Sequence, residues 1–422
     1  MGSTARDLWR ALGPGVLFTG AAVGVSHLVQ STRAGASYGF ALAGLVVLAN
    51  LTKFPAFRFG PLYAVATGTS LLEGYRRQGT WALAVYAIMT VGTMFTVAAA
   101  VTLVTAGLAK ALFGLPWSPF AISAGLLGVC AALLASGGYR WLDRAGKAIV
   151  GVLAVSTVAA TVMALPRIDF GAARWVPSAS MFGPRDVAFM AALVGWMPSA
   201  IDVAVWQSLW TLARRDETGH RPSGHDSAFD FYLGYLGTAF LALCFVALGA
   251  AVLGGARIEE APGRFAEQVI DVYAQTLGAW SRPIIGAAAF ATMFSTTLTV
   301  VDGFPRALSV LVDRFREPER DDPAVRRVDR SARYWTSLVV LVLGAMAILA
   351  LLTRTMPALI DLATTLSFLS APVLSWLNHR AVLAPEIPEE HRPRPWLIAT
   401  SWAGIVFQSL FALYFLHLQL AG

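Results

Sequence analysis

The sequence predicts an all-α integral membrane protein, because long apolar segments dominate it. Of its 422 residues, 56% are hydrophobic and 14% are charged, whereas an average soluble domain has about 25% charged residues. Segments of about 20 apolar residues recur, each long enough to cross the ~30 Å hydrocarbon layer as a helix. They predict about eleven transmembrane helices in a single domain, residues 1–422. The segments are 13–37, 39–66, 80–112, 118–137, 146–166, 187–213, 229–254, 278–304, 333–353, 356–378 and 396–419.

The positive charges predict the orientation in the membrane. Most of the 32 Lys and Arg residues lie in or beside alternate loops, beginning with Arg6 and Arg10 ahead of the first segment. Cytoplasmic loops carry the excess of such residues in membrane proteins, so we expect a cytoplasmic N-terminus and, after eleven crossings, an external Gly422. The net charge of +7 is therefore a topology signal and does not indicate nucleic acid. A multi-pass protein of a bacterial cytoplasmic membrane is expected.

The sequence contains no motif that indicates catalysis. Its two cysteines, Cys130 and Cys244, lie inside apolar segments, which argues against disulfides and against a cysteine metal cluster. There is no ATP-binding loop either. We expect a protein that is not an enzyme and has no cofactor.

Two helices are interrupted at matching places. Gly20, Gly24 and Ser26 interrupt the first segment, and Gly195, Pro198 and Ser199 interrupt the sixth, five helices later. Such interruptions in corresponding helices are typical of inverted-repeat transporters whose binding site lies at the bilayer midplane. The alternative is a pair of kinks that neighbouring helices tolerate. The predicted repeats are about 13–166 and 187–378, with an extra helix at about 396–419.

Several motifs resemble the Nramp (natural resistance-associated macrophage protein) family of divalent metal transporters. The stretch from Gly13 to Phe40, GPGVLFTGAAVGVSHLVQSTRAGASYGF, is similar to the family's first helix. Shorter matches follow in the family's order, namely LAN at 48–50, ATG at 66–68, WMPS at 196–199 and STTLT at 295–299.

The resemblance implies the leucine-transporter fold, in which helices 1 and 6 unwind around the substrate. Family members import Mn²⁺, Fe²⁺ and related ions, usually with protons. The implied function is a secondary transporter that works by alternating access. The candidates for substrate binding at the two breaks are Ala21, Gly24, Ser26, His27, Val194, Trp196, Met197 and Ser199.

The family's metal site is only partly present. The places of its helix 1 Asp and Asn fall on Gly24 and His27, and its helix 6 Met is retained as Met197, followed by Ser199 at the family's His position. A dehydrated divalent ion favours a carboxylate ligand, and none remains here. His27 and Met197 are the remaining candidate metal ligands. Each has an alternative role: His27 as a proton switch, a partner for an organic solute or a structural residue, and Met197 as packing.

Charged and polar residues inside the apolar segments are candidates for gating or coupling. No Asp or Glu lies between Glu73 and Asp143, so helix 3 lacks the acidic pair that the family uses for protons. Asp202 is expected either to approach the substrate or to pair with Arg33. Lys53 either snorkels towards the cytoplasm or replaces a coupling cation. Thr364 stands where the family has a polar Gln.

Three functions therefore remain open. The resemblance favours uptake of a divalent transition metal through a non-standard site. The loss of the carboxylate favours a small organic solute, with Trp196 as a flat wall for its body. A third possibility is a non-transporting membrane sensor. The expected partners are the metal ion or small molecule, a coupling proton or cation, and the lipid bilayer.

Overall fold

The computed structural model describes residues 14–136, 139–171, 173–218, 223–256, 258–316, 331–352 and 355–421. Every regular element in these ranges is a helix, and each of the predicted apolar segments is helical, so the all-α prediction is confirmed. Seven of the described helices are long and apolar enough to cross a membrane by length and composition alone. The helices, in chain order, are α2 (Pro14–Ala22), η1 (Ser26–Ser31), α3 (Thr32–Tyr38), α4 (Ala43–Thr67), α5 (Leu71–Gln78), α6 (Thr80–Phe113), α7 (Pro119–Ala135), α8 (Tyr139–Ala164), α9 (Pro184–Gly195), α10 (Asp202–Thr218), α11 (Gly224–Leu253), α12 (Pro262–Leu277), α13 (Ser281–Arg316), α14 (Ala332–Leu352), α15 (Met356–Val382) and α16 (Pro395–Ala421), with short 3₁₀ turns η2 (Leu165–Arg167), η3 (Ala179–Phe182) and η5 (Glu389–His391).

Both predicted helix breaks are present. Helix 1 stops at Ala22 and resumes as the π-helix η1 and then α3, so the interruption falls at Val23 and Gly24. Helix 6 stops at the end of α9 and resumes as α10, and the Met197–Pro198 peptide bond between them is cis. Apart from these two interrupted crossings, the predicted crossings are single helices in the described residues.

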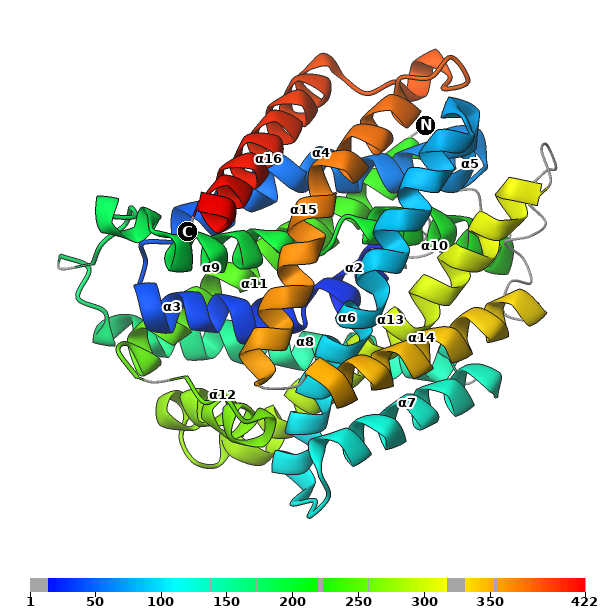
Figure 1. Cartoon of the computed structure of the whole chain (residues 1–422). Coiled ribbons are helices and arrows are strands. Elements are labelled where there is room, and N and C mark those ends of the chain that lie inside the picture. The colour runs from blue at the N-terminus through cyan, green and yellow to red at the C-terminus, as the bar shows by residue number, and fades with distance from the viewer. Residues whose placement is uncertain are drawn as a thin grey trace.

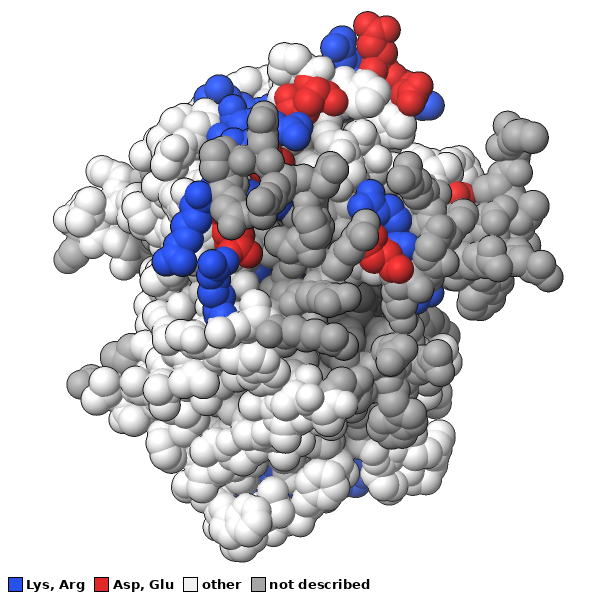
Figure 2. Space-filling view, turned by 90° about the vertical axis from the view of Figure 1, so that its right-hand side faces the viewer, with Lys and Arg blue, Asp and Glu red and all other residues white. Residues whose placement is uncertain are grey.

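The molecule has two distinct ends. Helix α5 lies at one end and α12 at the other, and the interrupted helix 1 runs through the middle beside α11 and α13 (Figure 1). On the face drawn in Figure 2, charged side chains of the described residues gather towards the α5 end, while the half towards α12 is mostly uncharged. This separation is what the solvated end and the apolar belt of a membrane protein require.

Glycines let helix 1 pack directly against α11. A methyl group on Gly35 would overlap the carbonyl oxygen of Val246, and one on Gly249 would overlap that of Thr32. Small residues at such crossings allow two helix backbones to approach closely, and this contact provides much of the association energy between helices in a membrane. The second half of helix 1, α3, is thereby fixed to α11.

A buried carboxylate organises the α5 end. Glu73 accepts hydrogen bonds from Arg76, with Arg76 Nη2 2.6 Å from Oε1, and from Arg77 Nε at 3.2 Å. It also lies 3.5 Å from Nε of Arg314 at the end of α13. Burial opposes ionisation, but Arg76, Arg314 and Arg77 outweigh it and hold the pKa of Glu73 below its usual range. The cluster ties α5 to α13.

We expect the substitution Gly249→Ala to destabilise the protein, because the added methyl group cannot fit against α3 without moving a helix backbone. Overpacking of this kind costs roughly 1–3 kcal/mol. The matched control is Gly237→Ala in the same helix, where nothing lies within 4 Å of the added methyl group. Unfolding temperatures in detergent should fall for the first variant and stay level or rise for the second.

We expect Glu73→Gln to destabilise the protein in a pH-dependent way. Because the pKa of Glu73 is lowered in the folded state, its charge stabilises the fold above the usual carboxyl pKa of about 4.3. That contribution is lost as the pH falls through the lower, folded-state pKa. The difference in unfolding temperature between wild type and Glu73→Gln should therefore be constant near neutral pH and shrink below about pH 4. Glu389→Gln, at an exposed site, should show no such difference.

Candidate functional site

A small cavity lies between the two helix breaks. It is bounded by the helix 1 break, α6, the segment joining α9 to α10, and α13. Its volume is about 40 Å³, so in this conformation it holds only water-sized molecules. Its lining residues are Ala21, Ala22, Val25, Ser26, Val97, Val101, Trp196, Ser199, Ala200, Asp202, Val203, Trp206, Thr296, Val300 and Phe304.

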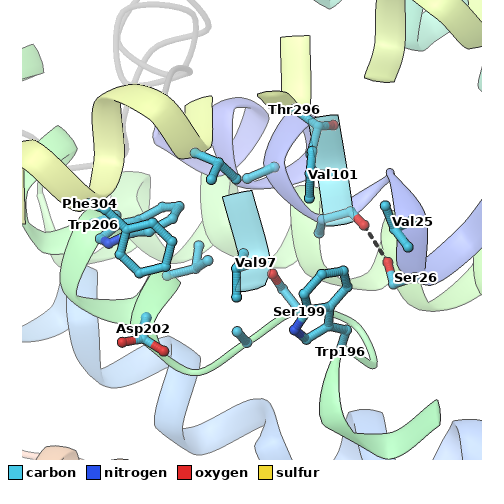
Figure 3. A pocket seen from close by; sticks show the side chains of 15 residues that line it. Val25, Ser26, Val97, Val101, Trp196, Ser199, Asp202, Trp206, Thr296 and Phe304 are labelled. Carbon is cyan, nitrogen blue, oxygen red and sulfur yellow. Dashed lines mark hydrogen bonds between the residues drawn. The ribbon is translucent and has the colours of Figure 1, made fainter. Parts of the chain in front are cut away.

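The cavity has aromatic walls and a few polar groups. Trp196 stands on one side, and Trp206 and Phe304 stand together on the other, with ring centroids 4.8 Å apart (Figure 3). Trp196 is fixed in place because its indole N–H donates to Ser367 Oγ of α15 at 2.8 Å. The two rings of the second wall meet edge to face, an arrangement that aromatic pairs favour. These walls offer flat apolar surfaces to whatever enters.

Two hydroxyl groups of the cavity lining come from the helix 1 break and from α13. The hydroxyl of Ser26 donates to the carbonyl oxygen of Ala22, the last residue of α2, at 2.6 Å (Figure 3). The hydroxyl of Thr296 donates to the carbonyl oxygen of Gly20 at 2.8 Å. Both hydroxyls therefore satisfy carbonyl groups that the interrupted helix leaves without a helical partner. Their remaining lone pairs can accept hydrogen bonds from a bound molecule.

Asp202 contributes a carboxylate to the lining. It begins α10, where the helix dipole favours a negative charge, and its Oδ1 accepts the Thr90 hydroxyl of α6 at 3.0 Å. The side chain is buried, with 2% of the residue exposed. That Asp202 approaches the substrate stays a prediction.

The alternative pairing of Asp202 with Arg33 is wrong. Arg33 instead binds Asp361 of α15 in a two-point contact, with Nη1–Oδ1 at 2.7 Å and Nη2–Oδ2 at 3.0 Å. The reason is that α3 continues helix 1 towards the α12 end, whereas α10 continues helix 6 towards the α5 end (Figure 1). Gln30 completes the contact, because its amide donates to Asp361 at 3.1 Å and accepts from Arg33 at 2.7 Å.

The Arg33–Asp361 contact joins three helices. The Arg33 guanidinium lies 5.0 Å from the ring centre of Phe189 in α9, within the range of a cation–π interaction. Thr364, one turn after Asp361, is 3.4 Å from the Gln30 amide. Arg33 and Thr364, both predicted to act in gating or coupling, therefore belong to one network outside the cavity lining.

Four of the predicted binding residues do not line the cavity. His27 is fully buried, and its Nε2 donates to the carbonyl oxygen of Thr238 in α11 at 2.9 Å. In the neutral ring with that tautomer, Nδ1 accepts from the Ser26 hydroxyl at 2.7 Å and shares that hydroxyl's one hydrogen with the Ala22 carbonyl oxygen. Both ring nitrogens are thus already engaged. Met197 and Val194 pack in an apolar cluster. Gly24 lies against the side chain of Thr296, where an added methyl group would be 3.0 Å away.

Lys53 is placed at the helix 6 break. Its Nζ donates to the carbonyl oxygens of Val194 at 2.6 Å, Gly195 at 2.8 Å and Ser199 at 3.3 Å. The side chain is fully buried, so it does not snorkel to the surface. Within the described ranges, no group of three or more His, Cys, Asp or Glu side chains could hold a metal ion.

Sequence reasoning missed the walls contributed by α6 and α13. Val97, Val101, Val300 and Phe304 are apolar residues in apolar helices, and nothing in their pattern distinguishes them from lipid-facing positions. Thr296 could have been found, because it lies in the STTLT motif of the eighth crossing.

The sequence of the whole chain matches a known family. A model described as natural resistance-associated macrophage protein-like (Nramp) matches residues 15–418. The chain belongs to the Nramp family. Family members are transporters, so this Nramp protein is of a transporter class and is not an enzyme, and it is a multi-pass membrane protein.

Two relatives are similar to this Nramp protein over different shares of its chain. An uncharacterised protein of Pasteurella multocida (strain Pm70) is 35% identical over 421 residues, which cover 99% of this chain and 94% of the relative. A divalent metal cation transporter, MntH, of Verminephrobacter eiseniae (strain EF01-2) is 30% identical over 149 residues, covering 35% of this chain and 34% of the relative.

Solved structures confirm the leucine-transporter fold. The manganese transporter of Eremococcus coleocola, in complex with an aromatic bis-isothiourea compound, has a TM-score of 0.72 and 12% identity, with 98% of this chain and 88% of that chain covered. MhsT in complex with L-phenylalanine has a TM-score of 0.64 and 13% identity, with 99% and 98% covered. At such identities the likeness concerns the fold alone.

We expect the contact between Arg33 and Asp361 to show energetic coupling in a double-mutant cycle. The two-point geometry and the Gln30 bridge favour coupling of about 1 kcal/mol, less than for a fully buried pair because 36% of the Asp361 side chain is exposed. Unfolding free energies of Arg33→Ala, Asp361→Ala and the double variant measure it. The exposed pair Arg282 and Asp271 is the control and should give about 0.5 kcal/mol or less. Additive effects at Arg33 and Asp361 would contradict the interpretation.

Proposed function

We propose that this Nramp protein is a secondary transporter that moves a small organic solute by alternating access through the cavity between the two helix breaks. The solute should be compact and carry hydroxyl or amino groups. Its polar groups would contact Ser26, Ser199 and Asp202, and its body would lie between the aromatic walls. Of the predicted binding residues, Ala21, Ser26, Trp196 and Ser199 support this proposal by lining the cavity.

The composition of the lining carries the proposal. Trp196, Trp206 and Phe304 provide apolar surface, and Asp202 is the one carboxylate among the lining residues. Small-molecule sites are typically apolar with a small number of placed polar groups, and this lining has that character. A divalent ion without its water shell needs several hard or nitrogen ligands, which this lining does not supply.

The relatives support a transporter and leave the cargo open. MhsT has been solved with L-phenylalanine, which supports the proposal that this fold can hold an organic solute. The Eremococcus coleocola protein is described as a manganese transporter, and the partial relative MntH as a divalent metal cation transporter. Divalent metal uptake through His27 and Met197 therefore stays a prediction of the family resemblance. It would require the His27 ring to give up its contacts with Ser26 and Thr238.

The cavity must widen during transport. Its present 40 Å³ is smaller than an organic solute needs. Widening requires the helices of one group to move relative to the other, as in alternating access. The proposed orientation has the α5 end in the cytoplasm of a bacterial cell, with the N-terminus inside and the C-terminus outside.

We expect the purified protein to bind an organic solute and to show no heat of binding with Mn²⁺. Isothermal titration with Mn²⁺ and with a panel of neutral hydroxylated solutes, amino acids and amines checks this, followed by uptake of any ligand found into proteoliposomes. Binding of Mn²⁺ that His27→Ala abolishes would contradict the proposal and favour the metal. Failure of every solute and of Mn²⁺ to enter would favour the sensor.

The aromatic wall should be required for uptake. We expect Trp196→Ala to weaken binding of the panel solute at least about tenfold, equivalent to roughly 1.4 kcal/mol, because it removes both the flat surface and the contact with Ser367. Trp280→Ala is the matched control, since Trp280 is 67% exposed at the start of α13. Equal uptake by both variants would place the solute elsewhere.

A further inference from the structure

The environment of Lys53 is unusual for a lysine at membrane depth. Lys53 lies near the middle of α4, and all three possible donors of its ammonium group meet backbone carbonyl oxygens, at 2.6, 2.8 and 3.3 Å. Burial of an ammonium group is costly unless its hydrogen bonds are satisfied. Here they are satisfied without any side-chain partner.

The three carbonyl groups belong to the end of an interrupted helix. Val194 and Gly195 are the last residues of α9, and Ser199 lies in the segment before α10. The C-terminal end of a helix carries partial negative charge on its unpaired carbonyl groups. In transporters with broken helices, such carbonyl groups are the places that bind a small coupling cation.

No counter-charge accompanies the ammonium group. None of the described carboxylates forms an ion pair with Lys53, whose partners are three backbone carbonyl oxygens. Four titratable or charged side chains of α4 and the helices packed against it have other partners. Arg58 of α4 lies over the Phe231 ring, and Asp202 of α10 accepts from Thr90. Tyr235 of α11 donates to the Asn50 carbonyl group, and His379 of α15 contacts Ser401. Carbonyl dipoles alone therefore hold the positive charge.

We propose that the carbonyl groups of Val194, Gly195 and Ser199 form a monovalent-cation site that the Lys53 ammonium group permanently fills. The Lys53 ammonium group takes the place of a coupling cation and is covalently attached to α4. Such a site can hold an ammonium-like cation, because its three carbonyl oxygens already accept hydrogen bonds from an ammonium group. The consequence for transport, which rests on the proposed function, is that solute uptake needs no external Na⁺.

The site can be tested by emptying it and offering it a free cation. Lys53→Ala removes the ammonium group and leaves space beside the three carbonyl groups, so we expect a lower unfolding temperature than wild type. Ammonium or methylammonium chloride should then raise the unfolding temperature of the variant by roughly 2–4 °C over tetramethylammonium chloride at equal ionic strength. Wild type should show no such preference.

Two further variants separate charge from packing. Lys53→Met fills the same space without a charge, so it should be destabilised and no cation should restore it. Lys110→Ala is the matched control, because Lys110 also donates to a backbone carbonyl group, that of Trp117 at 2.8 Å, but at an exposed position. A Lys53→Met variant as stable as wild type would overturn the proposal, and so would a Lys53→Ala variant that no cation stabilises. If Lys53→Ala does not fold, the comparison of Lys53→Met with wild type decides.

Transport provides a second readout. Uptake of the panel solute by wild type should be equal in sodium, potassium and choline media, and uptake by Lys53→Ala should be restored by ammonium. Dependence of wild-type uptake on Na⁺ would overturn the proposal. If no solute is taken up at all, the proposed function fails, while the unfolding measurements still decide whether the cation site exists.

Discussion

The low-dielectric interior of a membrane protein requires a partner for every backbone polar group, and both helix breaks are organised around this requirement. At the helix 1 break, hydroxyl groups supply the donors, with Ser26 serving Ala22 and Thr296 serving Gly20. At the helix 6 break, the donor is the ammonium group of Lys53. One break is therefore completed by neutral groups and the other by a charge. The two breaks at the centre of the molecule therefore differ in the kind of hydrogen-bond donor that completes them.

The cavity follows from the same requirement. A hydroxyl group that donates to a carbonyl group at the helix 1 break keeps a lone pair that can accept a hydrogen bond. The lining can therefore accept hydrogen bonds there without a charged side chain from helix 1. The Lys53 ammonium group donates to the carbonyl groups at the end of α9, and Asp202 is the carboxylate among the lining residues. A family whose members carry metal ions thus has here a member whose central cavity is mostly apolar and aromatic.

The sequence predicted the parts of this arrangement that leave local signals. The helices and both breaks were predictable, because length, apolarity, Gly24 and Pro198 act on the backbone where they stand. The partner of Arg33 was not, because it depends on which direction each half-helix takes after its break. The orientation of His27 depends on the π-helical turn of η1, which rotates the ring towards α11. The division into repeats at about 13–166 and 187–378 stays a prediction.

Contacts at glycine residues are of two kinds, those with a neighbouring backbone and those with a neighbouring side chain. At Gly35, Gly60, Gly195, Gly234 and Gly249, backbone meets backbone, which joins helix 1 to α11, α4 to α10, and α9 to α15. Across the cavity, towards α13, the corresponding contacts are made by the side chains of Thr296 and Trp206. Side chains can change rotamer and interlocked backbones cannot, so the contacts at Thr296 and Trp206 can rearrange more readily than those at the glycines.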